Sequence, residues 1–93
     1  MVTHIVMFRL HDRSPAGVEA VTAPLRSLEG NVPTLRSIEV GANSAPGPDG
    51  CDVVLVTRFD DVEGLDAYRS HPFHLGVVEK IKPMVATRSY VDF

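Results

Sequence analysis

Two segments of this chain, residues 2–10 and 51–59, have the composition of β-strands but carry large apolar side chains on both faces. With 93 residues, the chain forms one domain, residues 1–93, whose own helices can cover only one face of a sheet. A large apolar face left in water is unfavourable, so we expect a homodimer joined sheet to sheet. The apolar side chains predicted for this second face are Ile5, Met7, Val54 and Val56.

The first helix is predicted to begin at Ser14-Pro15, a capping side chain followed by a proline at the first helical position. Gly30 is a typical helix end. Because Pro24 removes a backbone hydrogen bond inside this segment, we expect a kink or a break near residues 22–24. The apolar residues at helical spacing are Val18, Val21, Leu25 and Leu28.

Two further helices are predicted in the second half of the chain. Asp60 and Glu63 resemble a capping box, which favours a helix that ends near Ser70. Pro72 begins the next helix, and Pro83 should bend or end it. The inner face of the first of these helices would hold Val62, Leu65 and Tyr68, and that of the second His74, Val78, Ile81 and Val85.

Residues 34–40 and 87–93 are predicted as the remaining strands. The order is then strand, helix, strand, strand, helix pair, strand. This order indicates an α+β, ferredoxin-like βαββαβ fold with a four-stranded antiparallel sheet and its helices on one face.

The composition excludes several classes of protein. A net charge of -3 argues against a nucleic-acid partner, and no run of apolar residues is long enough to span a membrane. The lone Cys51 cannot form an internal disulfide, and the first ten residues are too short for a signal peptide, so we expect a cytoplasmic protein. Residues 47–50 lack the Lys and Ser/Thr of a phosphate-binding loop, and no cofactor is expected.

The strongest candidate site is the segment 67–74, where Tyr68, His71 and His74 gather at a predicted helix junction. His74 lies in the first turn of its helix, where burial and the helix dipole favour the neutral imidazole that a general base requires. The alternative is a half-buried histidine bonded to the backbone. Tyr68 would be a proton donor near His74, or a core tyrosine with its tip at the surface.

His71 precedes Pro72, where the backbone leaves the helical region, so it is predicted to cap the junction; direct contact with a substrate is the alternative. Three ligands for a metal ion could come from His71 and His74 together with His4 or Asp92. Because Pro72 makes the directions of the two histidines diverge, we expect no metal site.

The two ends of the chain are predicted to meet. In a ferredoxin-like sheet the first and last strands are antiparallel neighbours, so His4 would oppose Asp92, with Tyr90 on the same face. An aspartate beside a histidine fixes the imidazole tautomer. The pair would form either a polar wall of a pocket or a purely structural contact.

Several segments together resemble the stress-responsive A/B-barrel (Dabb) family of dimeric α+β barrels. The resemblance extends over nearly the whole chain. Its marks are residues 4–10, Val40-Gly41, Phe59-Asp60-Asp61, residues 68–74, Ile81-Lys82-Pro83 and Val91-Asp92-Phe93.

The resemblance implies the fold and the dimer, and it implies roles for four residues. A plant polyketide cyclase of the family is similar in its catalytic tyrosine and histidine, which match Tyr68 and His74, and in pocket residues that match His4 and Asp92. The aromatic residues of its first helix are replaced here by Val21 and Leu25, so the substrate should differ.

We therefore expect an apolar pocket between sheet and helices in which His74 removes a proton alpha to a carbonyl and Tyr68 binds the enolate oxygen. Cyclase, isomerase and lyase reactions on a hydrophobic, polyketide-like oxo compound would all fit. The alternatives are a non-enzymatic, stress-related binding module and a cofactor-free dimeric-barrel monooxygenase. The pocket walls are predicted to include Val6, Phe8, Val21, Leu25, Leu55 and Val78.

Overall fold

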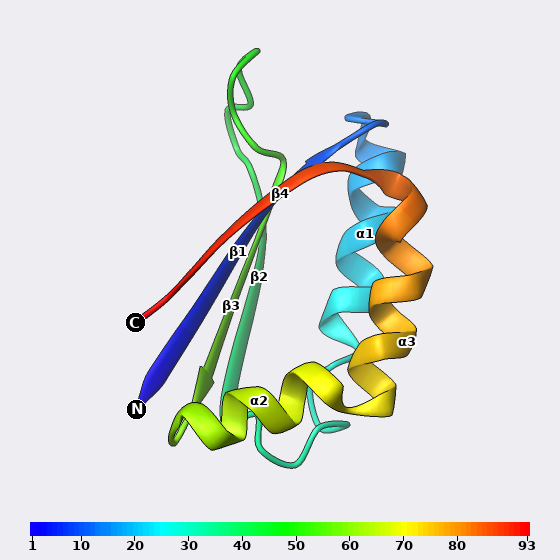
Figure 1. Cartoon of the computed structure of the whole chain (residues 1–93). Coiled ribbons are helices and arrows are strands. Elements are labelled where there is room, and N and C mark those ends of the chain that lie inside the picture. Colours follow the sequence, from blue (N-terminus) through cyan, green and yellow to red (C-terminus); the bar gives the residue numbers. More distant parts are fainter.

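The computed structural model describes residues 1–93, and it confirms the predicted ferredoxin-like fold. Four antiparallel strands form one sheet in the order β2-β3-β1-β4, and the helices lie on one side of it (Figure 1). The elements in chain order are β1 (Val2–Leu10), α1 (Pro15–Arg26), β2 (Ser37–Ala42), β3 (Val53–Phe59), α2 (Val62–Ser70), α3 (Pro72–Ile81), a short 3-10 turn (Lys82–Met84) and β4 (Val85–Asp92).

Strand β1 is central and pairs with both β3 and β4. Its register places His4 opposite Thr57 on one side and opposite Asp92 on the other. The two chain ends are joined by reciprocal backbone hydrogen bonds between Thr3 and Phe93. The strand faces alternate as predicted: the buried positions of β1, which face the helices, are His4, Val6, Phe8 and Leu10.

Helix α1 begins as predicted, with the Ser14 hydroxyl accepting a hydrogen bond from the Gly17 N–H. The predicted break at residues 22–24 is wrong, because α1 continues through Pro24 to Arg26. Pro24 lies in the last turn, where its ring removes only one intrahelical bond and where it is buried against the core. Past the helix, Gly30 adopts a positive φ of 79° that ends the turn.

Helix α2 begins one residue later than the capping-box pattern predicts. The N-cap is Asp61, whose carboxylate accepts a hydrogen bond from the Gly64 N–H at 2.8 Å, whereas Asp60 pairs with Arg36. Val62 is 56% exposed, so its predicted place on the inner face is wrong. At about 100° per residue, Val62 is rotated roughly 110° from the centre of the buried face formed by Gly64, Leu65 and Tyr68.

Strand bounds also differ from the prediction. Residues 32–35 form a turn, closed by the Leu35 N–H donating to the Val32 carbonyl, so β2 is shifted to Ser37–Ala42. Helix α3 ends at Ile81 just before Pro83, as predicted, and β4 then begins early, at Val85. None of the helices has both the length and the hydrophobicity that a membrane-crossing segment requires.

Candidate active site

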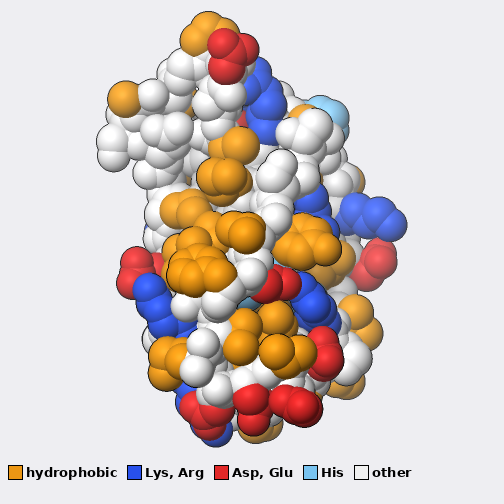
Figure 2. Space-filling model, turned by 60° about the vertical axis from the view of Figure 1, so that its left-hand side comes forward, with side chains coloured by type: hydrophobic (Ala, Val, Ile, Leu, Met, Phe, Trp, Pro, Cys, Tyr) orange, Lys and Arg blue, Asp and Glu red, His pale blue; other side chains and the backbone are white.

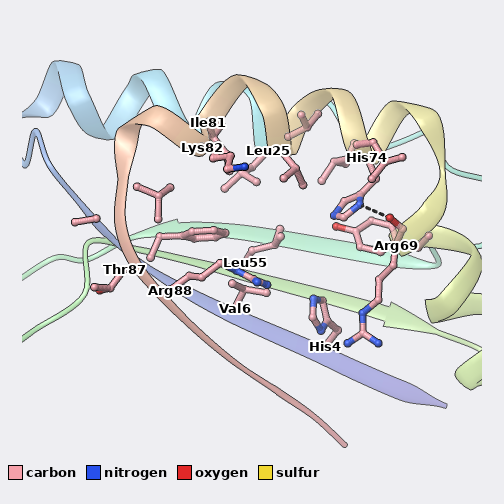
Figure 3. A pocket seen from close by; sticks show the side chains of 18 residues that line it. His4, Val6, Leu25, Leu55, Arg69, His74, Ile81, Lys82, Thr87 and Arg88 are labelled. Atoms are coloured by element: carbon pink, nitrogen blue, oxygen red, sulfur yellow. Dashed lines mark hydrogen bonds between the residues drawn. The ribbon is translucent and has the colours of Figure 1, made fainter.

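A cavity of about 510 Å³ lies between the sheet and helices α2 and α3, and we call it the central cavity (Figure 3). Its volume is in the usual range for sites that bind small molecules. Twelve of its 18 lining residues are hydrophobic. Predicted wall residues that do line it are Val6, Phe8, Leu25, Leu55 and Val78. Val21 does not line the cavity, because it is fully buried in the core.

His74 lines the central cavity from the first turn of α3. Its Nδ1 lies 3.0 Å from the carbonyl oxygen of Arg69, the contact drawn as a dashed line in Figure 3. A carbonyl can only accept a hydrogen bond, so Nδ1 carries the proton and Nε2 of the neutral ring is the free acceptor. Burial lowers the pKa of His74 from its ordinary value of 6.5, although the bond to Arg69 opposes this shift.

Tyr68 lies beside His74, with ring centroids 4.3 Å apart. The tyrosine is fully buried from the inner face of α2 and packs against Phe59, yet its hydroxyl has no hydrogen-bond partner. Burial raises the pKa of this hydroxyl, so it stays protonated and available as a donor. A buried hydroxyl without a partner is destabilising.

His4 forms the wall opposite His74, and it is buried on β1. Its Nδ1–H donates to Asp92, which also accepts a hydrogen bond from Arg69 at 2.6 Å. Burial opposes ionisation of Asp92, but these two hydrogen bonds together lower its pKa. The predicted meeting of His4 and Asp92 therefore occurs, and it links both chain ends to α2.

The other sequence candidates lie outside the central cavity. Asp92 contacts His4 from behind, and Tyr90 is mostly exposed, with its ring 5.9 Å from that of His4. His71 is the N-cap of α3, where its Nδ1 accepts a hydrogen bond from the Phe73 N–H, in agreement with the predicted capping role. His71 and His74 thus point to different partners, and no cluster of three or more His, Cys, Asp or Glu side chains is arranged to hold a metal ion.

Three cationic residues of the cavity wall were missed by the sequence analysis: Arg69, Lys82 and Arg88. Arg88 could have been found from strand alternation, because it lies two residues before Tyr90 and four before Asp92 on the face assigned to the helices. Lys82 follows the end of α3 and is exposed, as is Lys80, and helical spacing does not show which of the two lines the cavity.

The fold and this cavity together define an α+β protein of the ferredoxin-like class with a histidine–tyrosine pair in its cavity. The family model of the stress-responsive A/B-barrel (Dabb) domain matches residues 2–93, and the chain belongs to this family. The resemblance noted from the sequence is thereby confirmed. Among curated proteins, none matches the chain.

Several solved structures are similar. A dimeric ferredoxin-like protein of unknown function from Thermobifida fusca is 33% identical, with a TM-score of 0.85 over 99% of this chain and 88% of that one. A dimeric protein of unknown function from Bacteroides fragilis is 28% identical, with a TM-score of 0.84 over 99% and 93%. The hydroxynitrile lyase of Passiflora edulis is 18% identical, with a TM-score of 0.83 over 99% and 90%, a likeness of fold alone.

Proposed function

We propose that this protein binds a hydrophobic oxo compound in the central cavity and transfers a proton without a cofactor. The observation that carries the proposal is the pairing of a free imidazole acceptor with an unpartnered hydroxyl donor. His74 Nε2 is unused by the protein, and the Tyr68 hydroxyl beside it has no partner. Both side chains line the same apolar cavity.

The chemistry follows from these two groups. His74 Nε2 accepts a proton from the carbon next to the substrate carbonyl, and the C–H electrons move to form an enolate. The Tyr68 hydroxyl donates a hydrogen bond to the enolate oxygen, where the negative charge develops. The protonated His74 then returns its proton to carbon or to a leaving group. Cyclisation, isomerisation and lyase reactions can all begin with this step.

The cavity environment supports this assignment. Burial keeps His74 neutral and Tyr68 protonated near pH 7, which are the states that the base and the donor require. Apolar walls strengthen the hydrogen bond to a developing oxyanion, because little water competes for it. That a hydroxynitrile lyase has the same fold supports the capacity of this scaffold for lyase chemistry.

Deuterium exchange tests the proposal directly. We expect the protein to accelerate exchange of the alpha protons of a long-chain methyl ketone in D₂O, followed by NMR. His74→Gln should lose this activity, whereas His11→Gln, which alters an exposed histidine outside the cavity, should retain it. The rate should fall as the pH drops through the lowered pKa of His74, below 6.5, since the protonated ring cannot accept a proton.

The main alternative is a binding module that uses the same cavity. Its support is the predominantly apolar lining, which would hold a ligand without any chemistry. If the wild type and His11→Gln bind the ketone but neither exchanges its alpha protons faster than buffer alone, this alternative is favoured and the catalytic proposal is contradicted. Oxygen uptake with a quinol substrate would instead favour a monooxygenase.

We further propose that two chains associate through the open face of the sheet, the side that no helix covers. Figure 2 brings this side forward and shows hydrophobic side chains gathered over its middle. Cross-strand pairs that share this face place Met7 beside Val54, and Ile5 between Val56 and Val91. Burying each such side chain is worth about 1.5–3 kcal/mol. Similar proteins from two bacteria are described as dimeric, which supports the same assembly here.

A further inference from the structure

Two cations in the central cavity have no partner in the protein. Arg88 makes no ion pair or hydrogen bond, and its guanidinium only lies over the ring of Tyr90, 5.3 Å from the centroid. Lys82 likewise has no partner. By contrast, Arg69, the third cation of the wall, is held by Asp92 and Asp66.

These two cations approach the cavity from opposite sides. Arg88 extends from β4, where it pairs with Phe8 across the sheet, and Lys82 follows the end of α3. In Figure 3, Arg88 lies along the sheet side of the cavity and Lys82 on the helix side. The cavity therefore carries a free positive charge on both its sheet side and its helix side.

The charge of this wall is opposite to that of the molecule. The chain has a net charge of -3, yet the cavity is lined by Arg69, Lys82 and Arg88 and by no aspartate or glutamate. The nearest acid, Asp92, is already bonded to His4 and Arg69. Besides burial, the positive charge of Arg88 contributes to lowering the pKa of His74, so Arg88 lies within electrostatic reach of the proposed base.

We propose that the ligand is an amphiphilic acid, whose carboxylate binds Arg88 while its apolar chain fills the rest of the cavity, with Lys82 adding positive charge from the helix side. Arginine presents a planar fork of donors that matches a carboxylate, and both cations are free to bind one. The identification of the substrate as an oxo acid rests on the proposed function. Binding of the acid itself does not depend on the proton transfer.

Calorimetric titration with decanoate and with decan-1-ol, which share a chain and differ in charge, tests this inference. We expect decanoate to bind at least about tenfold more tightly than the alcohol, as charge-assisted hydrogen bonds predict, and to weaken with added salt. Arg88→Gln should remove most of this preference and leave alcohol binding unchanged, and Lys82→Gln should reduce it. Lys80→Gln, which alters an exposed lysine of α3 outside the central cavity, is the matched control.

Arg88 is exposed and unpaired, so its replacement should leave the fold intact, which circular dichroism can verify. Equal affinity for the acid and the alcohol in the wild type, or an unchanged preference in Arg88→Gln, would overturn the inference. The wild type separates the two proposals. If it prefers decanoate but catalyses no exchange, the proton-transfer mechanism fails and the acid site stands. If it catalyses exchange but shows no preference for decanoate, the acid site alone is rejected. His74→Gln should lose exchange and keep decanoate binding.

Discussion

At the scale of single residues, the site is defined by which hydrogen-bonding atoms the protein leaves unused. His74 donates its Nδ1–H to the Arg69 carbonyl, and His4 donates its own to Asp92. The Tyr68 hydroxyl makes no hydrogen bond, although the residue is fully buried. Most buried polar atoms in proteins are paired, so this unpaired hydroxyl is an exception, and we propose that it binds a ligand.

Tyr68→Phe tests that view, because it removes the hydroxyl and keeps the ring. We expect the free energy of unfolding to stay the same or to rise by up to about 1 kcal/mol, since a buried group without a partner is lost. Ketone exchange should fall about 100-fold, as for the loss of one oxyanion donor. Urea unfolding and NMR exchange measure the two effects.

Tyr90→Phe is the matched control, because Tyr90 is exposed and lies outside the central cavity. Tyr90→Phe should change neither the free energy of unfolding nor the rate of ketone exchange. A clear loss of stability in Tyr68→Phe would mean that the hydroxyl has a partner within the folded protein, and the proposed donor role would fail.

At the scale of elements, one buried aspartate joins the ends of the two central strands. Asp52 precedes β3 and is 2% exposed; its carboxylate accepts hydrogen bonds from the Leu10 N–H at the end of β1 and from Arg13 at 2.8 Å. Arg13 also donates to the carbonyls of Gly47 and Gly50. This network fixes the long loop between β2 and β3 against the start of α1.

Asp52→Asn should weaken this network. Burial opposes ionisation of Asp52, but the bonds from Leu10 and Arg13 outweigh it and lower the pKa below 3.8. We expect Asp52→Asn to reduce the free energy of unfolding by about 2 kcal/mol near neutral pH, as for a hydrogen bond to a charged group. Urea denaturation measures this loss.

The pH dependence has a definite sign. A carboxyl whose pKa is lower in the folded state contributes stability that is fully present above 3.8 and is lost as the pH falls through the lower folded value. The difference between wild type and Asp52→Asn should therefore shrink in acid. Asp60→Asn, which breaks the exposed pair with Arg36, should cost much less, and an equal cost would contradict the role of burial.

At the scale of the whole molecule, the two faces of the sheet have different surroundings. Its inner face builds the core and the central cavity, and its open face carries the apolar side chains that we assign to dimer formation. The exposed fraction of Met7 on this open face is 44%. Because the two faces alternate along β1, a change on one face leaves the other in place.

Val54→Lys should therefore convert a dimer to a monomer without loss of the cavity. We expect light scattering at micromolar concentration to give a mass of two chains for the wild type and of one for the variant, because a buried lysine has no partner on this face. Val62→Lys alters an exposed apolar residue on the helix side and should leave the mass unchanged. A wild type with the mass of one chain would contradict the assembly.

Much of the fold could be predicted from the sequence, because local rules determine it. Period-two alternation identifies the inner face of β1. Helix α1 begins after the capping residue Ser14, and helix α3 begins at Pro72, both as the sequence predicts. The ends of helices were less predictable. Helix α1 tolerates Pro24 in its last turn, where one hydrogen bond is lost, and the N-cap of α2 is one residue later than predicted. Backbone energies of a few kcal/mol can be compensated by packing, which the sequence does not display.

The chain by itself determined that His4 meets Asp92, because the order of strands fixes which ends are neighbours. It also determined that Tyr68 and His74 face inward, through helical spacing. Only the tertiary structure decided that Val21 fills the core and not the cavity, and that His74 offers Nε2 because Nδ1 reaches Arg69. It alone placed Lys82 and Arg88 in the lining of the central cavity without partners. Such contacts join elements distant in sequence, and they depend on how helices pack on the sheet.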